Sequence, residues 1–301
     1  MAADIQYDPQ GLQALNAALA FIVFSVALHL RVEQVRAVLA TPRVLAVGIV
    51  AQWLLLPALT LALVLIVQPP PTFAAGMMLI AACPGGNVSN YFAMVARGNA
   101  VLSVALTTIA TVACALLTPL LFVTGMRLID NPGDPLRVPL GGMLALLFWT
   151  VVLPLAAGLA MQRFVPQWAG RARKPSRLLA AGLLAAIIVV GMFNNRGLLG
   201  DLGLAPMLLL VIAHNAIALA GGYGLARLAR CPEPEARAIT LETGIQNAGL
   251  GLILIFNFYP ESGGMMTLVA TWGVWHLVAG ALLARWWRRR PVALAADGAG
   301  T

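Results

Sequence analysis

Nine long apolar segments, joined by short polar connections, limit what this chain can fold into. A bilayer core about 30 Å thick requires about 20 apolar residues in a helix, and each segment is close to that length. Strands are excluded because the segments are continuous apolar runs, whereas the strands of a membrane barrel alternate in hydrophobicity over about ten residues. The chain is therefore predicted to be an all-α polytopic membrane protein, with helices over 12–30, 43–67, 73–96, 100–126, 139–162, 177–195, 204–229, 237–258 and 264–287.

Composition favours burial in lipid over a core that folds in water. Of the 301 residues, 60% are hydrophobic and only 10% are charged, whereas a typical soluble domain has about 25% charged residues. The polar connections are too short to form a second domain. We therefore expect an N-terminal tail over 1–11, one nine-helix domain over 12–287 and a C-terminal tail over 288–301.

The basic residues lie between the apolar segments, mostly on one side. The net charge of +8 could suggest nucleic-acid binding, but short basic runs between apolar segments are the pattern of membrane topology. With nine helices, 16 of the 19 basic residues share the side of the C-terminus, namely Arg31, Arg36, Arg43, Arg97, Arg163, Arg171, Arg173, Lys174, Arg177, Arg227, Arg230, Arg237, Arg285, Arg288, Arg289 and Arg290. Because basic connections stay in the cytoplasm, the N-terminus is predicted to lie outside and the C-terminus inside.

The cysteines and the first residues lead to two negative expectations. Cys83, Cys114 and Cys231 are odd in number and lie in or beside apolar segments, so they indicate neither a disulfide framework nor a metal site. The first ten residues contain Asp4 and Asp8 but no Lys or Arg, unlike a cleavable signal peptide. The first apolar segment is therefore expected to be retained.

Glu242 is the one acidic residue that falls well inside an apolar segment. The other ten of the eleven acids lie in the tails or connections. A carboxylate at membrane depth costs roughly 2.5 to 3.5 kcal/mol on insertion scales, and such a residue usually marks a functional site.

Two predicted helices, 73–96 and 237–258, are interrupted by residues that break helices. The first contains "CPGGNVSN", in which Pro84 removes a backbone donor and two glycines follow, and the second contains Gly244 next to Glu242. The charge-based topology runs the two segments in opposite directions. Paired breaks in inverted halves of a chain point to the binding site of an inverted-repeat transporter.

The polar residues around the breaks are hard oxygen donors. Glu242 and Gln246 are spaced i, i+4, and the helix over 100–126 has hydroxyls at the same spacing on Ser103, Thr107 and Thr111. One carboxylate with amides and hydroxyls suits an alkali cation, whereas a divalent ion usually requires more carboxylates. For the hydroxyls, hydrogen bonding to their own helix is the alternative interpretation.

Together, "CPGGNVSNYFAMVARGNAVLSVALTTIAT", "ETGIQNAGLG" and "WGVWH" resemble the bile acid:sodium symporter family, including its bacterial members, over about residues 12–287. The resemblance implies an inverted-repeat transporter with a core and a panel domain, two crossing discontinuous helices in the core, and nine helices where ten are usual. It also implies sodium-coupled symport of an organic anion by alternating access at the bacterial plasma membrane.

The resemblance further implies two sodium ions and a substrate cavity near the crossing. The first ion would be held by Ser89, Asn90, Ser103, Thr107 and Glu242, and the second by Gln52, Glu242, Gln246 and the backbone oxygens of Thr243 and Ile245. The substrate would contact Asn87, Asn247 and His276. Asn87 and Leu277 differ from residues common in the family, so a small carboxylate such as pantoate or pantothenate fits as well as a bile acid.

Three other functions are compatible with parts of the sequence. A proton-coupled transporter or antiporter would normally require a second charged residue beside Glu242. An intramembrane hydrolase would require Ser89 or Ser103 to meet His276, and the sequence contains no G-x-S-x-G motif. A receptor or structural protein would have no need of two inverted breaks. We expect no enzyme activity and no nucleic acid or obligate protein partner, with the lipid bilayer and a small organic anion as the interacting species.

Overall fold

The computed structural model describes residues 9–29, 41–129, 138–194 and 204–290, and every regular element in these ranges is a helix. In chain order they are α1 (Pro9–Ala27), α3 (Pro42–Val50), η1 (Ala51–Leu55), α4 (Leu56–Val67), α5 (Pro71–Ala82), α6 (Val88–Val95), α7 (Ala100–Ile129), α8 (Leu140–Leu147), η2 (Phe148–Val152), α9 (Leu153–Phe164), α10 (Pro166–Asn194), α12 (Leu204–Leu228), α13 (Glu233–Gly244), α14 (Ala248–Phe258) and α15 (Gly263–Arg288). The all-α polytopic prediction is confirmed. Within the described ranges, five helical stretches are long and apolar enough to cross a membrane.

Two predicted helix starts differ from those observed by four residues or more. The helix expected over 177–195 begins at Pro166, so the basic connection before it is itself helical. The helix expected from residue 237 begins at Glu233, and Glu233 and Glu235 occupy its first turn, where the positive end of the helix dipole favours acidic side chains. Parts of both predicted tails, residues 1–8 and 291–301, lie outside the described residues.

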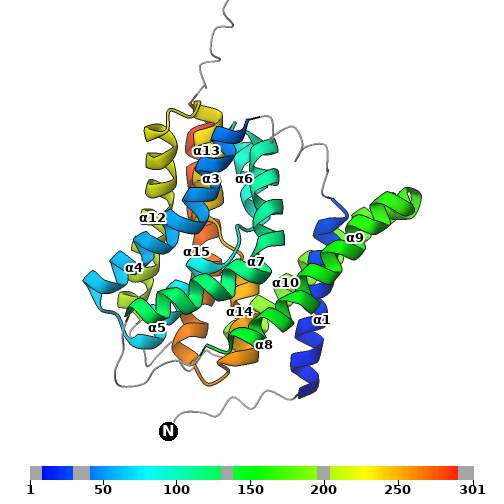
Figure 1. Ribbon diagram of the computed structural model, residues 1–301, viewed down its shortest axis with the longest axis horizontal. Coiled ribbons are helices and arrows are strands. Elements are labelled where there is room, and N and C mark those ends of the chain that lie inside the picture. Colours follow the sequence, from blue (N-terminus) through cyan, green and yellow to red (C-terminus); the bar gives the residue numbers. More distant parts are fainter. Residues whose placement is uncertain (1–8, 30–40, 130–137, 195–203, 291–301) are drawn as a thin grey trace, which may run out of the picture.

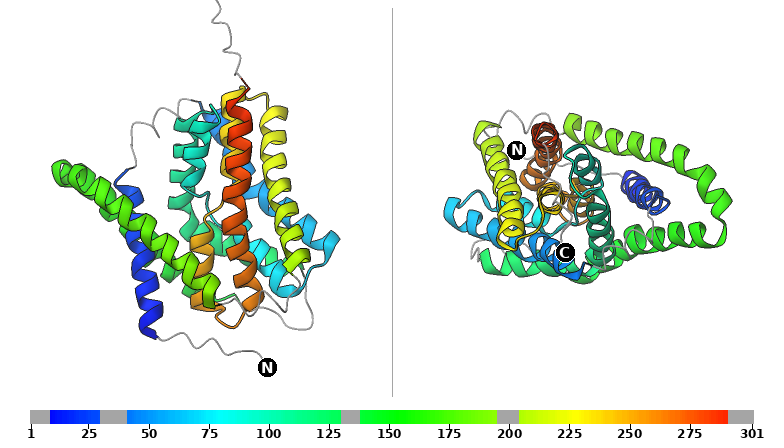
Figure 2. Two further views of the ribbon diagram at one scale, coloured as in Figure 1. Left: turned by 180° about the vertical axis from the view of Figure 1, so that it is seen from behind. Right: turned by 90° about the horizontal axis from the view of Figure 1, so that it is seen from above.

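The helices form two groups that stand side by side (Figures 1 and 2). In the smaller group, α1 packs against α9, η2 and α10. The larger group contains α3–α7 and α12–α15, with α12 packed along α13 and α15 along α5. Contacts of α1 with α14 and of α7 with α8 join the groups.

Two helices contain a π-helical turn directly before a Leu-Pro pair. In η1 the turn precedes Leu56–Pro57, and in η2 it precedes Leu153–Pro154. Because proline has no backbone N–H, the carbonyl four residues earlier loses its partner and the helix widens locally. Gln52 lies in the η1 turn and is buried, so this widening determines where its amide points.

Arg237 on α13 ties three helix ends together. Its side chain is only 3% exposed, and its Nε donates to Glu233 at 2.9 Å. Its Nη1 donates to the carbonyl oxygens of Ala96, just after α6, at 2.8 Å and of Trp287, in the last turn of α15, at 3.2 Å. The guanidinium therefore adds a donor to carbonyl groups at the ends of two helices, where partners within the helix run out. The Trp287 carbonyl also accepts the Arg290 N–H at 2.9 Å.

We predict that Arg237→Met destabilises the protein by roughly 3 kcal/mol, because the Ala96 and Trp287 carbonyls lose a side-chain donor and Glu233 loses its closest cation. The measurement is thermal unfolding of the detergent-purified protein. Arg227→Gln is the matched control: Arg227 lies 3.5 Å from the same carboxylate but its side chain is 51% exposed, so its removal should cost under about 1 kcal/mol. Equal losses in both variants would contradict the prediction.

Candidate functional site

The two predicted breaks cross each other in extended conformation. Gly85 and Gln246 form an antiparallel bridge between the α5–α6 and α13–α14 connections. The Gly86 N–H donates to the Ile245 carbonyl at 2.8 Å, and the Asn247 N–H donates to the Pro84 carbonyl at 2.9 Å. Backbone groups that left the helices are thus paired with each other, as burial in a membrane protein requires.

Side chains from other helices satisfy the carbonyls freed at the two breaks. Thr118 on α7 donates to the Ala82 carbonyl at 2.7 Å, and Gln52 donates to the Cys83 carbonyl at 3.0 Å. At the other break, Gln246 donates to the Thr243 carbonyl at 2.8 Å, and Asn215 on α12 donates to the Gly244 carbonyl at 2.7 Å. The extended segments are therefore held in place from three neighbouring helices.

Glu242 lies in the last turn of α13 and is 1% exposed. Three hydroxyls surround its carboxylate: Ser89 at 2.6 Å and Ser103 at 3.2 Å from Oε2, and Thr107 at 2.7 Å from Oε1. Asn90 joins the same cluster, since its Oδ1 lies 2.8 Å from the Ser103 hydroxyl and 3.1 Å from the Thr107 hydroxyl. The five residues expected at the first ion site are thus in one cluster.

This cluster contains more oxygen acceptors than hydrogen atoms to share among them. The Thr107 hydroxyl also lies 3.0 Å from the Ser103 carbonyl, so six oxygen–oxygen contacts link the group. Each hydroxyl can donate only one hydrogen, so three hydroxyls supply three of the six contacts. Protonating Glu242 would add a fourth. An oxygen-rich cluster with this deficit is chemically suited to a hard cation.

The residues expected at a second ion site lie directly beside the first cluster. The amides of Gln52 and Gln246 hydrogen-bond to each other, with distances of 2.8 and 3.1 Å. Gln246 Nε2 lies 3.4 Å from the Glu242 carbonyl and 2.8 Å from that of Thr243. The Ile245 carbonyl is at the crossing itself, where it accepts from the Gly86 N–H. A void of about 10 Å³ is lined by Gln52 and Glu242 together with apolar side chains.

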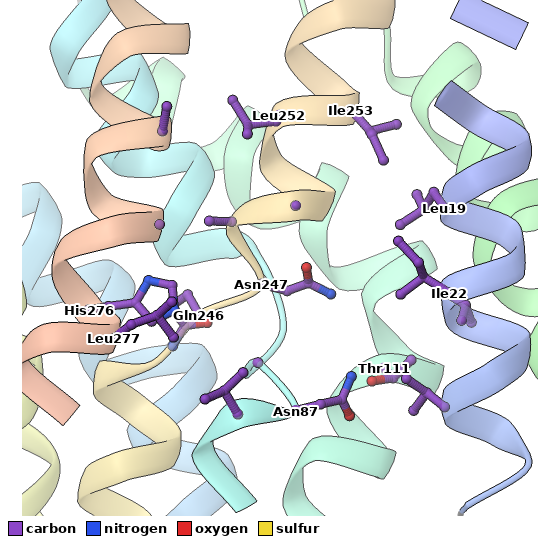
Figure 3. Close-up of a pocket in the computed structure, with 18 residues that line it drawn as sticks. Leu19, Ile22, Asn87, Thr111, Gln246, Asn247, Leu252, Ile253, His276 and Leu277 are labelled. Carbon is purple, nitrogen blue, oxygen red and sulfur yellow. The ribbon is translucent and has the colours of Figure 1, made fainter. Parts of the chain in front are cut away.

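The residues expected to contact a substrate line a larger cavity of about 140 Å³ between the crossing and α1. Figure 3 shows the amides of Asn87 and Asn247 in this space, with His276 and Gln246 on one side and Leu19 and Ile22 of α1 opposite. None of the described lining residues carries a full charge when His276 is neutral. The N-termini of α6 and α14 begin at the same place, at Val88 and Ala248.

Two polar residues, Thr111 and His214, bond to neighbouring helical groups, and the serines and the histidine that a hydrolase would need do not meet. The Thr111 hydroxyl donates to the Thr107 carbonyl one turn earlier, although the residue lines the cavity. His214 pairs with Thr60 at 2.7 Å and stacks on Trp272, apart from the cavity lining. His276 bonds the Trp272 carbonyl at 2.8 Å, whereas Ser89 and Ser103 donate to Glu242. The Ser–His pair required by a hydrolase is therefore absent from the described residues.

Sequence reasoning missed the residues that support the crossing from outside. Thr118 and Asn215 bind freed carbonyls, but each is one polar residue in a long apolar helix, a pattern that also fits ordinary helix packing. Gly85 is identified in the sequence only as a helix breaker. In the structure it faces Glu242, and a Cβ at Gly85 would overlap Oε1 and lie 2.7 Å from the carboxyl carbon.

Comparisons with known proteins find one matching family and several related transporters. Residues 16–217 match the model of the sodium bile acid symporter family. The chain is 30% identical over 272 residues to an uncharacterized sodium-dependent transporter, YocS, of Bacillus subtilis, covering 90% of this chain and 82% of that protein. It is 28% identical to the probable chloroplastic sodium/metabolite cotransporters BASS2 of rice and BASS1 of Arabidopsis thaliana. These matches cover 91% and 90% of this chain but only 64% and 66% of the two plant proteins.

We predict that Gly85→Ala displaces the Glu242 carboxylate and lowers the melting temperature by several degrees, because the added methyl group cannot fit beside Oε1. Thermal unfolding of the purified variant measures this effect. Gly141→Ala on α8 is the control, since a Cβ there meets no atom within 4 Å. A Gly85→Ala protein as stable as Gly141→Ala would show that the close approach is unimportant.

Proposed function

Because the chain belongs to the sodium bile acid symporter family, we propose that it moves a small organic anion together with sodium by alternating access. The chain is a membrane transporter and not an enzyme, in keeping with the family and with relatives named as sodium-dependent transporters. The proposal concerns the ions, the anion and the mechanism. The observation that carries it is the excess of oxygen acceptors around Glu242.

In this proposal the first sodium ion binds among Ser89, Asn90, Ser103, Thr107 and Glu242. The hydroxyls are free to turn their hydrogens away, so that their oxygens face the ion and Glu242 balances its charge. A proton on Glu242 would add one donor to a cluster that is rich in oxygen acceptors, and we propose a metal cation in its place. The family resemblance supplies the expectation of sodium among the alkali cations.

We assign a second ion to Gln52, Gln246, Glu242 and the carbonyls of Thr243 and Ile245. A small void beside Gln52 and Glu242, otherwise lined by apolar side chains, has about the volume of one water-sized sphere and lies next to two of these residues. The two amides bond to each other in this conformation, so an ion here would require Gln246 to rotate its oxygen inward. Binding would therefore fix the α13–α14 connection.

The cavity suits an anionic substrate even though none of its described lining residues is basic. Two helix N-termini, those of α6 and α14, open onto it and present the positive ends of their dipoles. Asn87, Asn247 and His276 supply hydrogen-bonding groups around the same space. A cavity of about 140 Å³ is close to an engineered cavity that takes benzene, so we propose a compact carboxylate in preference to a four-ring bile acid.

The two groups of helices provide the moving parts. We assign α1, α8–α9 and α10 to the panel domain and the remaining helices to the core, because the cavity lies between α1 and the crossing. Rocking of one group against the other would open the cavity to each side of the membrane in turn. We place the protein in a bacterial plasma membrane with the C-terminus in the cytoplasm. Two sodium ions with one monovalent anion would carry one net charge inward, favoured by about 2.3 kcal/mol per 100 mV.

We predict a sodium-specific rise in melting temperature, measured in NaCl and KCl at matched ionic strength. A ligand that binds only the folded protein must stabilise it. Glu242→Ala should lose the rise completely, together with sodium-dependent uptake in proteoliposomes. Thr107→Val should require about tenfold more sodium for half of the effect, because one ligand is lost.

Thr108→Val is the matched control for Thr107→Val. The two threonines are adjacent on α7, but the Thr108 hydroxyl bonds only its own helix, at the Val104 carbonyl 2.7 Å away. Its sodium response should match wild type. A wild-type response equal in both salts would refute sodium binding, and a rise that depends on pH instead would favour proton coupling.

We also predict different effects for the two cavity asparagines. Asn247 Oδ1 accepts the Leu250 N–H at 3.0 Å and caps α14, so Asn247→Ala should cost about 1 kcal/mol of stability as well as substrate affinity. Asn87 makes no such cap on α6, so Asn87→Ala should weaken substrate binding with little change in stability. The assay is the thermal shift produced by a panel of small carboxylates in sodium. Equal stability losses in the two variants would contradict this division.

A further inference from the structure

A second, separate groove lies at the end of the molecule where the chain leaves α15. It holds about 440 Å³ between α12, α13 and α15, whose nearby ends are together at the top of Figure 1. Its walls include Ala216, Ala220, Tyr223, Leu283, Trp286 and Arg290. This groove shares no residue with the cavity at the crossing or with the cation cluster.

The groove is apolar at one end and basic at the other. Along α12 its wall runs from Ala216 through Ala220, both exposed small residues, to Tyr223 near the end of the helix. Leu283 on α15 contributes to the apolar part, and Arg290 lies two residues beyond that helix. The lining changes from apolar to basic along the helix axes, as the surroundings do from a bilayer core to its headgroups.

The charges that face the groove leave one cation without an acidic partner. Glu233 is already bound by Arg237 at 2.9 Å and by the Tyr223 hydroxyl at 3.0 Å. Arg290 makes no ion pair within the described part of the chain, and its guanidinium lies 3.9 Å from the centre of the Trp286 ring. Trp286 is 47% exposed, in the position of an aromatic residue at the lipid headgroup level.

We propose that this groove binds one anionic phospholipid, with its phosphate at Arg290 and an acyl chain between α12 and α15. Basic pockets between transmembrane helices recognise anionic headgroups, and the π face of Trp286 holds the guanidinium toward the groove mouth. The small side chains of Ala216 and Ala220 leave room for the chain along α12. Arg227, Arg288 and Arg289 add positive charge around the same end. The inference depends on the membrane location of the chain and not on its proposed substrate or ions.

The test compares phosphatidylglycerol with phosphatidylcholine added to the detergent-purified protein in KCl without sodium. We expect phosphatidylglycerol to raise the melting temperature and phosphatidylcholine of the same chain length to have little effect. Arg290→Gln should require about fivefold more phosphatidylglycerol, since one arginine near an anionic headgroup contributes about that factor. Arg289→Gln is the matched control, because it removes the same charge from the next residue, which does not line the groove.

A steric variant tests the acyl-chain part without altering any charge. Ala220→Phe should fill the groove and abolish the response to phosphatidylglycerol, whereas Ala213→Phe, exposed on the same helix outside the groove, should retain it. Equal effects of the two lipids would overturn the proposal. So would an equal loss in Arg289→Gln and Arg290→Gln, which would indicate diffuse attraction to the basic surface, or a full response in Ala220→Phe.

Discussion

The carboxylate of Glu242 must be satisfied in a protein interior at membrane depth, and the packing around the crossing depends on that requirement. Hydroxyls from α6 and α7 surround it, and Gly85 leaves the space that its Oε1 occupies. The carboxylate is therefore contacted by the first break, α6 and α7, whose contacting residues lie at least 135 positions before it in the sequence. Any change in their relative positions alters the surroundings of the charge, which is the coupling that an ion-driven transporter requires.

At the crossing, the C-termini of the broken helices face different surroundings from their N-termini. The C-termini of α5 and α13 face Thr118, Gln52, Gln246 and Asn215, which donate to their last carbonyls. The N-termini of α6 and α14 open instead onto the cavity. Broken helices thus place partial negative charge beside the proposed ion sites and partial positive charge beside the proposed anion site, without a basic side chain among the described residues of the cavity.

Helix α13 carries both of the buried charged side chains found among the described residues, and different groups surround the two charges. Arg237 meets a carboxylate and two backbone carbonyls, so its charge is matched within the protein. Glu242, five residues later, meets neutral hydroxyls only. The first charge fastens helix ends together, as a structural residue does. The second lacks a cation from the described protein, and this difference on one helix adds to the excess of oxygen acceptors as a reason for placing an ion at Glu242.

The sequence by itself determined the all-α fold class, the two breaks and nearly all of the candidate ligands, and it predicts nine apolar passes. These follow from local properties: the length of apolar runs, the helix-breaking chemistry of "PGG", and the high cost of one acid in an apolar segment. Tertiary structure alone decided which oxygens meet, because Ser89, Thr107 and Glu242 are brought together by packing between distant helices. It also decided the roles of Thr118, Asn215 and Arg237, whose partners are backbone carbonyls that no sequence pattern marks. The sequence also placed the start of α13 four residues too late, because it counted Arg237 among the basic residues of a connection. In the folded chain Arg237 is buried among helix ends, inside α13.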